Sequence, residues 1–126
     1  RSTLFPYTTL FRSSYNKRFY ELVKKVRRNQ KSYFATMDKT FLAEVLRPME
    51  EELDRRLKTE RPTLPTALQF RKAVWDMRGW QNMWVATYTE NAKNNSIKCE
   101  KFIDKWILKT EEFIKERQQP KLQFEE

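Results

Sequence analysis

The amino-acid sequence predicts an all-α, four-helix bundle-like protein made of two duplicated helical hairpins, and three observations support this prediction. Only one glycine, Gly79, occurs among 126 residues, which disfavours β-hairpins because their tight turns need residues with positive φ. Apolar residues recur at steps of three and four along most of the chain, which is the period of a helix that buries one face. A stretch in the first half also matches a stretch in the second half.

Residues 1–13 stand apart from this pattern. Their apolar residues follow neither a helical nor a strand period, and threonines and Pro6 interrupt any run long enough for a secretory signal. The segment TLFPYTTLFRS, residues 3–13, resembles the translation of a common short-read sequencing adapter. We therefore interpret residues 1–13 as an artefact outside the domain; the alternative is a genuine aromatic N-terminal arm.

Residues 14–58 are predicted to form the first hairpin. Its first helix carries one apolar stripe: Phe19, Leu22, Val23, Val26, Tyr33, Phe34 and Met37. Its second helix follows Asp38, a good N-cap residue, and carries Leu42, Val45, Leu46, Met49, Leu53 and Leu57. Pro48 interrupts this helix, which is therefore kinked there or broken, with Pro48 in the first turn of a new helix.

Residues 67–118 are predicted to form the second hairpin, after a linker over residues 59–66 that contains two prolines. Its first helix has the apolar face Phe70, Ala73, Val74, Met77, Gln81, Trp84, Val85 and Tyr88. Residues 90–96 are interpreted as a loop or frayed join, with Ser96 as the N-cap of the last helix. That helix has the stripe Cys99, Ile103, Trp106, Ile107, Thr110 and Ile114. Residues 14–118 are expected to form one helical domain, followed by a mobile tail over residues 119–126.

The two hairpins resemble each other in sequence. Residues 19–36 align with residues 70–87 through six identities in eighteen positions: Phe19/Phe70, Val23/Val74, Arg27/Arg78, Gln30/Gln81, Ala35/Ala86 and Thr36/Thr87. A register shift of one residue then pairs Glu50 with Glu100, Leu53 with Ile103, Asp54 with Asp104 and Leu57 with Ile107. A shared helical period explains matched apolar residues but not matched Arg, Gln and Ala-Thr. The pattern predicts an internal duplication packed about a pseudo-twofold axis; the alternative is two unrelated amphipathic helices.

The repeated motif, VRxxQxxY in the first hairpin and MRxxQxxW in the second, resembles a motif of uncharacterised short helical proteins of gut bacteria and their mobile elements. This resemblance covers both hairpins and implies no particular function.

Composition excludes several classes of function. The chain has no histidine and a single cysteine, which excludes an internal disulfide, a Cys/His zinc site and histidine-dependent catalytic triads. No glycine-rich phosphate loop occurs, and the carboxylate pairs Glu50/Asp54 and Glu100/Asp104 are expected to form salt bridges. We therefore expect no enzyme activity, no catalytic or metal site and no cofactor. The single cysteine fits a reducing, cytoplasmic setting. No apolar run reaches the ~18 residues that span a bilayer, so no membrane insertion is expected.

Two charged surfaces are candidate binding sites. The formal net charge is +9, which favours anionic partners and also serves solubility. One face of the first helix is predicted to carry Lys17, Lys24, Arg27, Arg28 and Lys31 opposite the apolar stripe, as in proteins that bind phosphate backbones; the alternative is an ordinary solvated face.

The second candidate surface surrounds a tryptophan. Trp75 lies away from the apolar face of the third helix and forms an interaction patch with Arg71, Lys72 and Arg78. An exposed tryptophan among cations is typical of a protein anchor or a base-stacking site; the alternative is that Trp75 covers the linker or the N-terminal segment, residues 1–13.

Gln30 and Gln81 fall within the apolar stripes. Each buried amide needs partners. We expect the two amides to bond each other or a backbone carbonyl, with a ligand pocket as the alternative.

These features predict a non-catalytic protein–protein interaction module that binds another protein through Trp75 and its surroundings. The alternative is a nucleic-acid-binding accessory protein without sequence specificity that uses the basic face of the first helix. The sequence predicts no oligomeric state.

Overall fold

The computed structural model describes residues 14–61 and 65–118. The described residues form α2 (Ser14–Thr36), α3 (Lys39–Phe41), the π-helical segment η2 (Leu42–Leu46), α4 (Arg47–Thr59), α5 (Pro65–Thr87) and α6 (Glu90–Gln118), and they contain no strand. The predicted all-α class is therefore confirmed. Helix α4 ends at Thr59 and helix α5 begins at Pro65, both inside the predicted linker. The interpretations of residues 1–13 and 119–126 concern segments outside the described residues.

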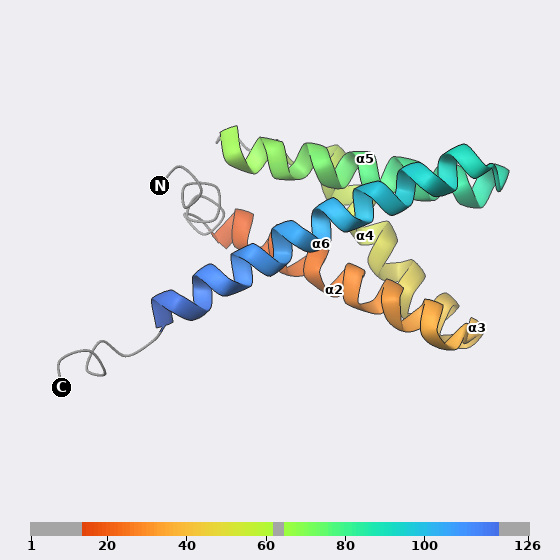
Figure 1. Cartoon of the computed structure of the whole chain (residues 1–126), viewed down its shortest axis with the longest axis horizontal. Coiled ribbons are helices and arrows are strands. Elements are labelled where there is room, and N and C mark those ends of the chain that lie inside the picture. The colour runs from red at the N-terminus through yellow and green to blue at the C-terminus, as the bar shows by residue number, and fades with distance from the viewer. Residues whose placement is uncertain (1–13, 62–64, 119–126) are drawn as a thin grey trace.

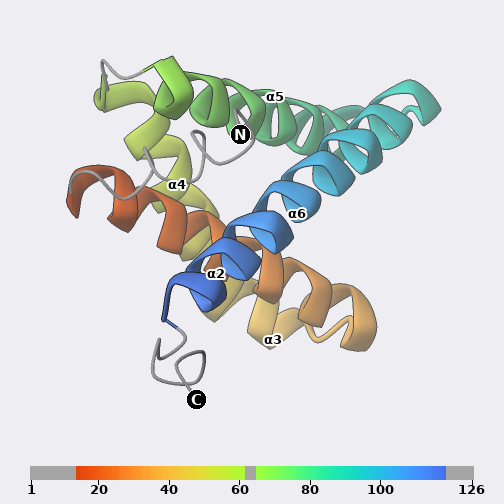
Figure 2. The ribbon, with the colours of Figure 1, turned by 60° about the vertical axis from the view of Figure 1, so that its left-hand side comes forward.

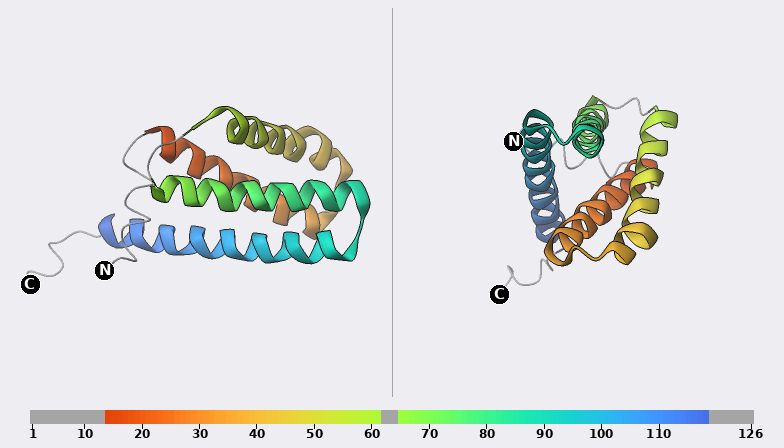
Figure 3. Two further views of the ribbon diagram at one scale, coloured as in Figure 1. Left: turned by 90° about the horizontal axis from the view of Figure 1, so that it is seen from above. Right: turned by 90° about the vertical axis from the view of Figure 1, so that its right-hand side faces the viewer.

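Two hairpins, α2 with α3 to α4 and α5 with α6, cross to form a four-helix arrangement (Figure 1). Seen along the bundle, α4 and α6 lie on opposite sides of the molecule (Figure 3). Between them, α2 lies at one edge and α5 at the other. Both turns lie at the same end, and α6 runs across α2 on its way from that end (Figure 2). Each hairpin thus meets the other along two edges, α2 with α6 and α4 with α5.

The second helix of the first hairpin is interrupted just before Pro48, as predicted. The carboxylate of Asp38 caps α3 by accepting hydrogen bonds from the backbone N–H groups of Thr40 and Phe41 at 2.9 and 3.2 Å. Pro48 has no N–H with which to continue the α-helical pattern. The chain widens into the π-helical segment, where the N–H of Arg47 bonds to the carbonyl of Leu42, and Pro48 lies in the first turn of α4.

Both hairpins turn through the same local structure. Met37 and Tyr88 adopt left-handed backbone conformations, with φ of 55° and 53°. Their N–H groups donate to carbonyls four residues earlier, which is the αL way of ending a helix. The hydroxyls of Thr36 and Thr87 also donate to carbonyls four residues earlier.

The predicted loop over residues 90–96 is wrong, because α6 begins at Glu90. The hydroxyl of Thr89 accepts a hydrogen bond from the N–H of Ala92 and so occupies the capping position predicted for Ser96. Ser96 is buried inside α6, and its hydroxyl donates to the carbonyl of Lys93. Burial of the small residues Ala92 and Ser96 against the bundle outweighs the low helix propensity of the surrounding asparagines.

Ten buried residues, drawn from α2, α4, α5 and α6, form one shared core: Phe19, Tyr20, Val23, Val26, Leu53, Leu57, Phe70, Val74, Met77 and Ile103. The rings of the equivalent residues Phe19 and Phe70 meet edge to face at 5.9 Å. The apolar stripes were predicted to continue to the turns, but Phe34, Val85 and Tyr88 are exposed. The reason is that the crossed hairpins separate toward their turns (Figure 1).

A pair of amides bonds the hairpins at their crossing. Gln30 and Gln81 each donate an amide hydrogen to the other's oxygen, at 2.9 and 3.1 Å, which confirms one of the predicted arrangements. Each amide nitrogen also donates to a glutamate of its own hairpin, Glu50 or Glu100, at 2.8 Å. These bonds supply the partners that buried amides need.

Two arginine–aspartate pairs flank the amides and connect the hairpins. Arg27 of α2 binds Asp104 of α6 through two hydrogen bonds of 2.8 and 2.9 Å. Arg78 of α5 binds Asp54 of α4 in the same way, at 2.8 and 3.1 Å. Both arginines are only 6% exposed. The expected salt bridges of Asp54 and Asp104 are confirmed, and equivalent residues exchange equivalent contacts as they do about a twofold axis.

Replacement of Arg78 by Met is expected to lower the free energy of unfolding by about 3 kcal/mol, because it leaves the Asp54 carboxylate without its bidentate partner. Urea unfolding followed by circular dichroism measures the change. Lys72→Met, which breaks an exposed ion pair with Asp76, is the control and is expected to change stability by less than about 1 kcal/mol. Equal effects of the two substitutions would contradict this account of the core.

Met37→Gly is expected to raise the free energy of unfolding by about 0.5–1 kcal/mol, because glycine adopts the left-handed conformation without the steric penalty of a side chain. Thermal and urea unfolding measure it. Lys25→Gly within α2 is the control and is expected to destabilise by about 1 kcal/mol. Destabilisation by Met37→Gly would show that the Met37 side chain contributes more than its backbone strain.

Candidate functional site

The predicted basic face of the first helix is mostly occupied by contacts inside the protein. Arg27 is buried against Asp104, Lys24 bonds to Glu111 at 2.9 Å, and Lys31 lies 3.2 Å from Asp104. Lys17 and Arg28 are exposed and form no salt bridge among the described residues. The prediction of one free stripe is therefore wrong, because carboxylates of α6 bind three of its five residues.

The predicted patch on α5 is partly exposed. The side chain of Trp75 is 49% exposed, as the sequence predicted. Lys72 is also exposed, and its ammonium group binds Asp76 at 3.0 Å. Arg71 and Arg78, in contrast, are buried and bind carboxylates of α4 and its C-terminal cap, so their inclusion in an exposed patch was wrong.

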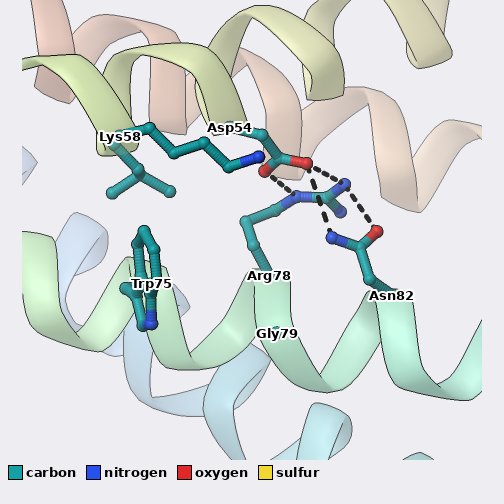
Figure 4. Close-up of a pocket in the computed structure, with 7 residues that line it drawn as sticks. Asp54, Lys58, Trp75, Arg78, Gly79 and Asn82 are labelled. Carbon is teal, nitrogen blue, oxygen red and sulfur yellow. Dashed lines mark hydrogen bonds and ion pairs between the residues drawn. The ribbon is translucent and has the colours of Figure 1, made fainter.

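Two adjoining hollows flank Trp75 along the edge between α4 and α5. One is lined by Asp54, Leu57, Lys58, Trp75, Arg78, Gly79 and Asn82. The other is lined by Leu57, Glu60, Arg61, Leu68, Arg71, Lys72, Trp75 and Asp76. In the first hollow, Trp75 stands toward α4 beside the ion pair of Arg78 with Asp54 (Figure 4). Trp75 and Leu57 are shared, so we name the two hollows together the Trp75 groove.

Gly79 leaves part of this groove without a side chain. No heavy atom lies within 4 Å of the position that a Cβ of residue 79 would occupy. Packing therefore does not require a glycine there, although a glycine inside a helix costs about 1 kcal/mol relative to alanine. The effect of Gly79 that the structure shows is an open space beside Trp75.

The equivalent edge between α2 and α6 is closed. In the sequence alignment, Lys24 corresponds to Trp75 and Arg28 to Gly79. Lys24 and the hydroxyl of Tyr20 both donate to the Glu111 carboxylate, at 2.9 and 2.7 Å. Two edges with the same arginine–aspartate pair therefore differ: a polar bridge covers one, and a half-exposed tryptophan beside a glycine borders the other.

The Trp75 groove carries excess positive charge. Lys58 and Arg61 at its rim are exposed and form no salt bridge among the described residues. Arg71 stacks on the ring of Phe19 at 3.8 Å and donates to Glu60 at 2.8 Å. Its second terminal nitrogen is buried without a hydrogen-bond partner among the described residues. These cations favour a ligand that carries carboxylates.

Electrostatics at the closed edge hold its carboxylates ionised. Burial opposes ionisation of Glu111, but hydrogen bonds from Lys24 and Tyr20 outweigh it, so the pKa of Glu111 lies below its ordinary value. Burial likewise opposes ionisation of Asp104, and its contacts with Arg27 and Lys31 lower that pKa. Burial and the neighbouring Glu111 raise the pKa of the Tyr20 phenol, which therefore keeps its proton for the bond.

The residues that the structure describes contain no group of three or more potential metal ligands. Among the same residues, no helix is both long and apolar enough to cross a membrane.

No family model, curated protein or solved structure matches this chain.

Sequence reasoning found Trp75 but missed the α4 side of the groove. Leu57 was assigned to the core, and Lys58 and Arg61 were not singled out. A usable signal was present in the alignment of the two hairpins, because Gly79 and Trp75 stand where the first hairpin has the cations Arg28 and Lys24.

Acidification is expected to destabilise the protein from about pH 4.5 downward. The pKa values of Glu111 and Asp104 are lower in the folded protein than in the unfolded chain, where they are about 4. Both carboxylates therefore stabilise the fold fully above pH values near the unfolded pKa. This stabilisation is lost as the pH falls through the pKa values of the folded protein. Urea midpoints between pH 7 and pH 2.5 measure this. Glu111→Gln is expected to flatten the profile, whereas exposed Glu51→Gln is expected to leave it unchanged. An unaltered profile for Glu111→Gln would contradict the assignment.

Proposed function

We propose that this chain is a non-catalytic protein–protein interaction module that binds a peptide segment of another protein in the Trp75 groove. The observation that carries the proposal is the half-exposed Trp75 between two hollows that share it. Tryptophan is enriched among the residues that dominate binding energy at protein interfaces, where it contributes a large area at a small entropic cost.

The groove is built on rigid elements. The neighbours of Trp75 on the inner side of α5, Val74 and Met77, are fully buried in the core. Arg78 fixes α5 to Asp54 of α4. The backbone on both sides of the groove is therefore held before a partner arrives, and such preorganisation reduces the entropy lost on binding.

The partner segment that fits this groove carries a bulky apolar residue with carboxylates next to it. The apolar side chain packs on Trp75, Leu57 and Leu68, which line the hollows. The carboxylates face Lys58 and Arg61 at the rim. Such charges act more on association rate and on partner choice than on the final affinity.

The matched contacts of the two hairpins support the proposal that the chain arose by internal duplication. In that history one edge kept a polar bridge through Lys24, and the other acquired Trp75 and Gly79 and opened. A cytoplasmic, reducing location is part of the proposal, because the single cysteine, Cys99, has no second cysteine in this chain to pair with. Asp54 and Asp104 support a non-catalytic role, since both are engaged in bidentate ion pairs.

The proposal is tested by panning a phage-displayed library of 12-residue peptides on the whole protein, without prior depletion on a variant. Selected peptides are expected to share an aromatic or large aliphatic residue beside Asp or Glu. In titration calorimetry, Trp75→Ala is expected to weaken their binding about 30-fold, the equivalent of the ~2 kcal/mol of a binding hot spot. Phe34→Ala, an exposed aromatic at the turn end, is the matched control.

A second variant separates the groove from the tryptophan alone. Gly79→Arg places in the hollow the side chain that Arg28 carries at the equivalent position, and the Cβ that it adds at residue 79 meets no neighbouring residue within 4 Å. It is expected to block the selected peptides without lowering stability. Peptides that bind the wild-type, Trp75→Ala and Gly79→Arg proteins equally well would overturn the proposed site.

A further inference from the structure

The outward face of α6 carries a row of four exposed lysines: Lys98, Lys101, Lys105 and Lys109. At 3.6 residues per turn, these side chains lie within about 80° around the helix and extend over about 16 Å of its length. Successive lysines rise by about 4.5–6 Å along the helix axis, so they form one line of positive charge.

Between Lys98 and Lys109 the acidic residues of α6 point away from the row, and so does Glu111. Glu100 accepts a hydrogen bond from Gln81, Asp104 binds Arg27, and Glu111 binds Lys24. All three acids are thus turned toward α5 or α2. No salt bridge to the four lysines occurs among the described residues. Glu112 and Glu116 are exposed on the same side of α6 beyond Lys109, so the lysine row extends from Lys98 to Lys109 and ends there.

The row on α6 also differs from the exposed cations on α2. On α2 the side chain of Glu21, which is 45% exposed, lies between Lys17 and Arg28 along the helix and within about 40° of both around it, so it interrupts their charge. On α6 no acidic residue shares the outward face between Lys98 and Lys109. The sequence analysis placed the candidate phosphate-binding face on the first helix and did not single out this row on α6.

Two exposed apolar side chains border the lysines on opposite sides. Phe102 is 53% exposed and Leu108 is 58% exposed, and on the helix they lie about 120° apart with the row between them. A helix that lies on a membrane instead gathers its apolar residues on one face, with the cations beside them. An aromatic ring next to lysines fits the combination that binds single-stranded nucleic acid, in which cations contact phosphates and aromatic rings stack on bases.

We propose that the outward face of α6 binds the phosphate backbone of single-stranded nucleic acid without sequence specificity. Lys98, Lys101, Lys105 and Lys109 contact successive phosphates, and a base stacks on Phe102. This surface is separate from the Trp75 groove, and the inference does not rest on the proposed protein-binding function.

Fluorescence anisotropy with fluorescein-labelled dT20 and the whole chain, at 20–200 mM KCl, tests the proposal. With about 0.7 counterions released per neutralised phosphate of a single strand, four contacts predict a slope of about −3 in log affinity against log salt. Lys101→Glu with Lys105→Glu is expected to lower affinity at least tenfold and to flatten the slope. Phe102→Ala is expected to lower affinity about fivefold or more, as for the loss of one stacked base.

The matched control is Lys17→Glu with Arg28→Glu, which changes net charge equally on α2 and is expected to reduce affinity no more than threefold. Trp75→Ala is expected to bind dT20 as the wild type does, so failure here is distinguishable from failure of the groove. Circular dichroism verifies that each variant is folded. Absence of binding at 20 mM KCl, equal loss in the α2 control, or binding to vesicles of phosphatidylcholine and phosphatidylserine but not to dT20 would overturn the proposal.

Discussion

Two buried arginines, one from each hairpin, bind aspartates of the opposite hairpin and so determine how the hairpins cross. Arg27 with Asp104 and Arg78 with Asp54 fix the two hairpins in register, and the paired amides of Gln30 and Gln81 lie between them. Apolar burial drives the hairpins together but is not directional. Bidentate ion pairs are directional, so these two pairs hold the hairpins in one relative orientation.

This crossing creates two equivalent edges between the hairpins. The candidate binding residues lie at only one of these edges. At the edge of α2 and α6, Lys24 and Glu111 complete the contact, so that edge serves stability. At the edge of α4 and α5, Trp75 lies where a bridge would otherwise stand, while the ion pair beneath it keeps the backbone rigid. The protein therefore contains two edges of the same architecture, and a few side chains distinguish the closed edge from the proposed binding surface.

Much of the fold followed from the sequence because it rests on periodicity. The helices, their core faces and the pairing of Gln30 with Gln81 were all predictable from spacing and repetition. The exposure of charged residues was not predictable in this way. Arg27 and Arg78 are each adjacent in sequence to a buried apolar residue, and the position of the partner helix determines whether such an arginine contacts water or a carboxylate. The start of α6 was missed for a related reason, since burial of Ala92 and Ser96 outweighs local propensity.

The π-helical segment has a further consequence for how the hairpins correspond. From Met37 to Glu50 the chain advances thirteen residues, whereas from Tyr88 to Glu100 it advances twelve. A π turn accommodates one residue more than an α turn, and η2 lies within the longer stretch. The π turn thus accommodates the one additional residue. As a result, Glu50 and Asp54 lie at the same positions around their helix as Glu100 and Asp104, and the difference in chain length leaves the crossing of the hairpins unchanged.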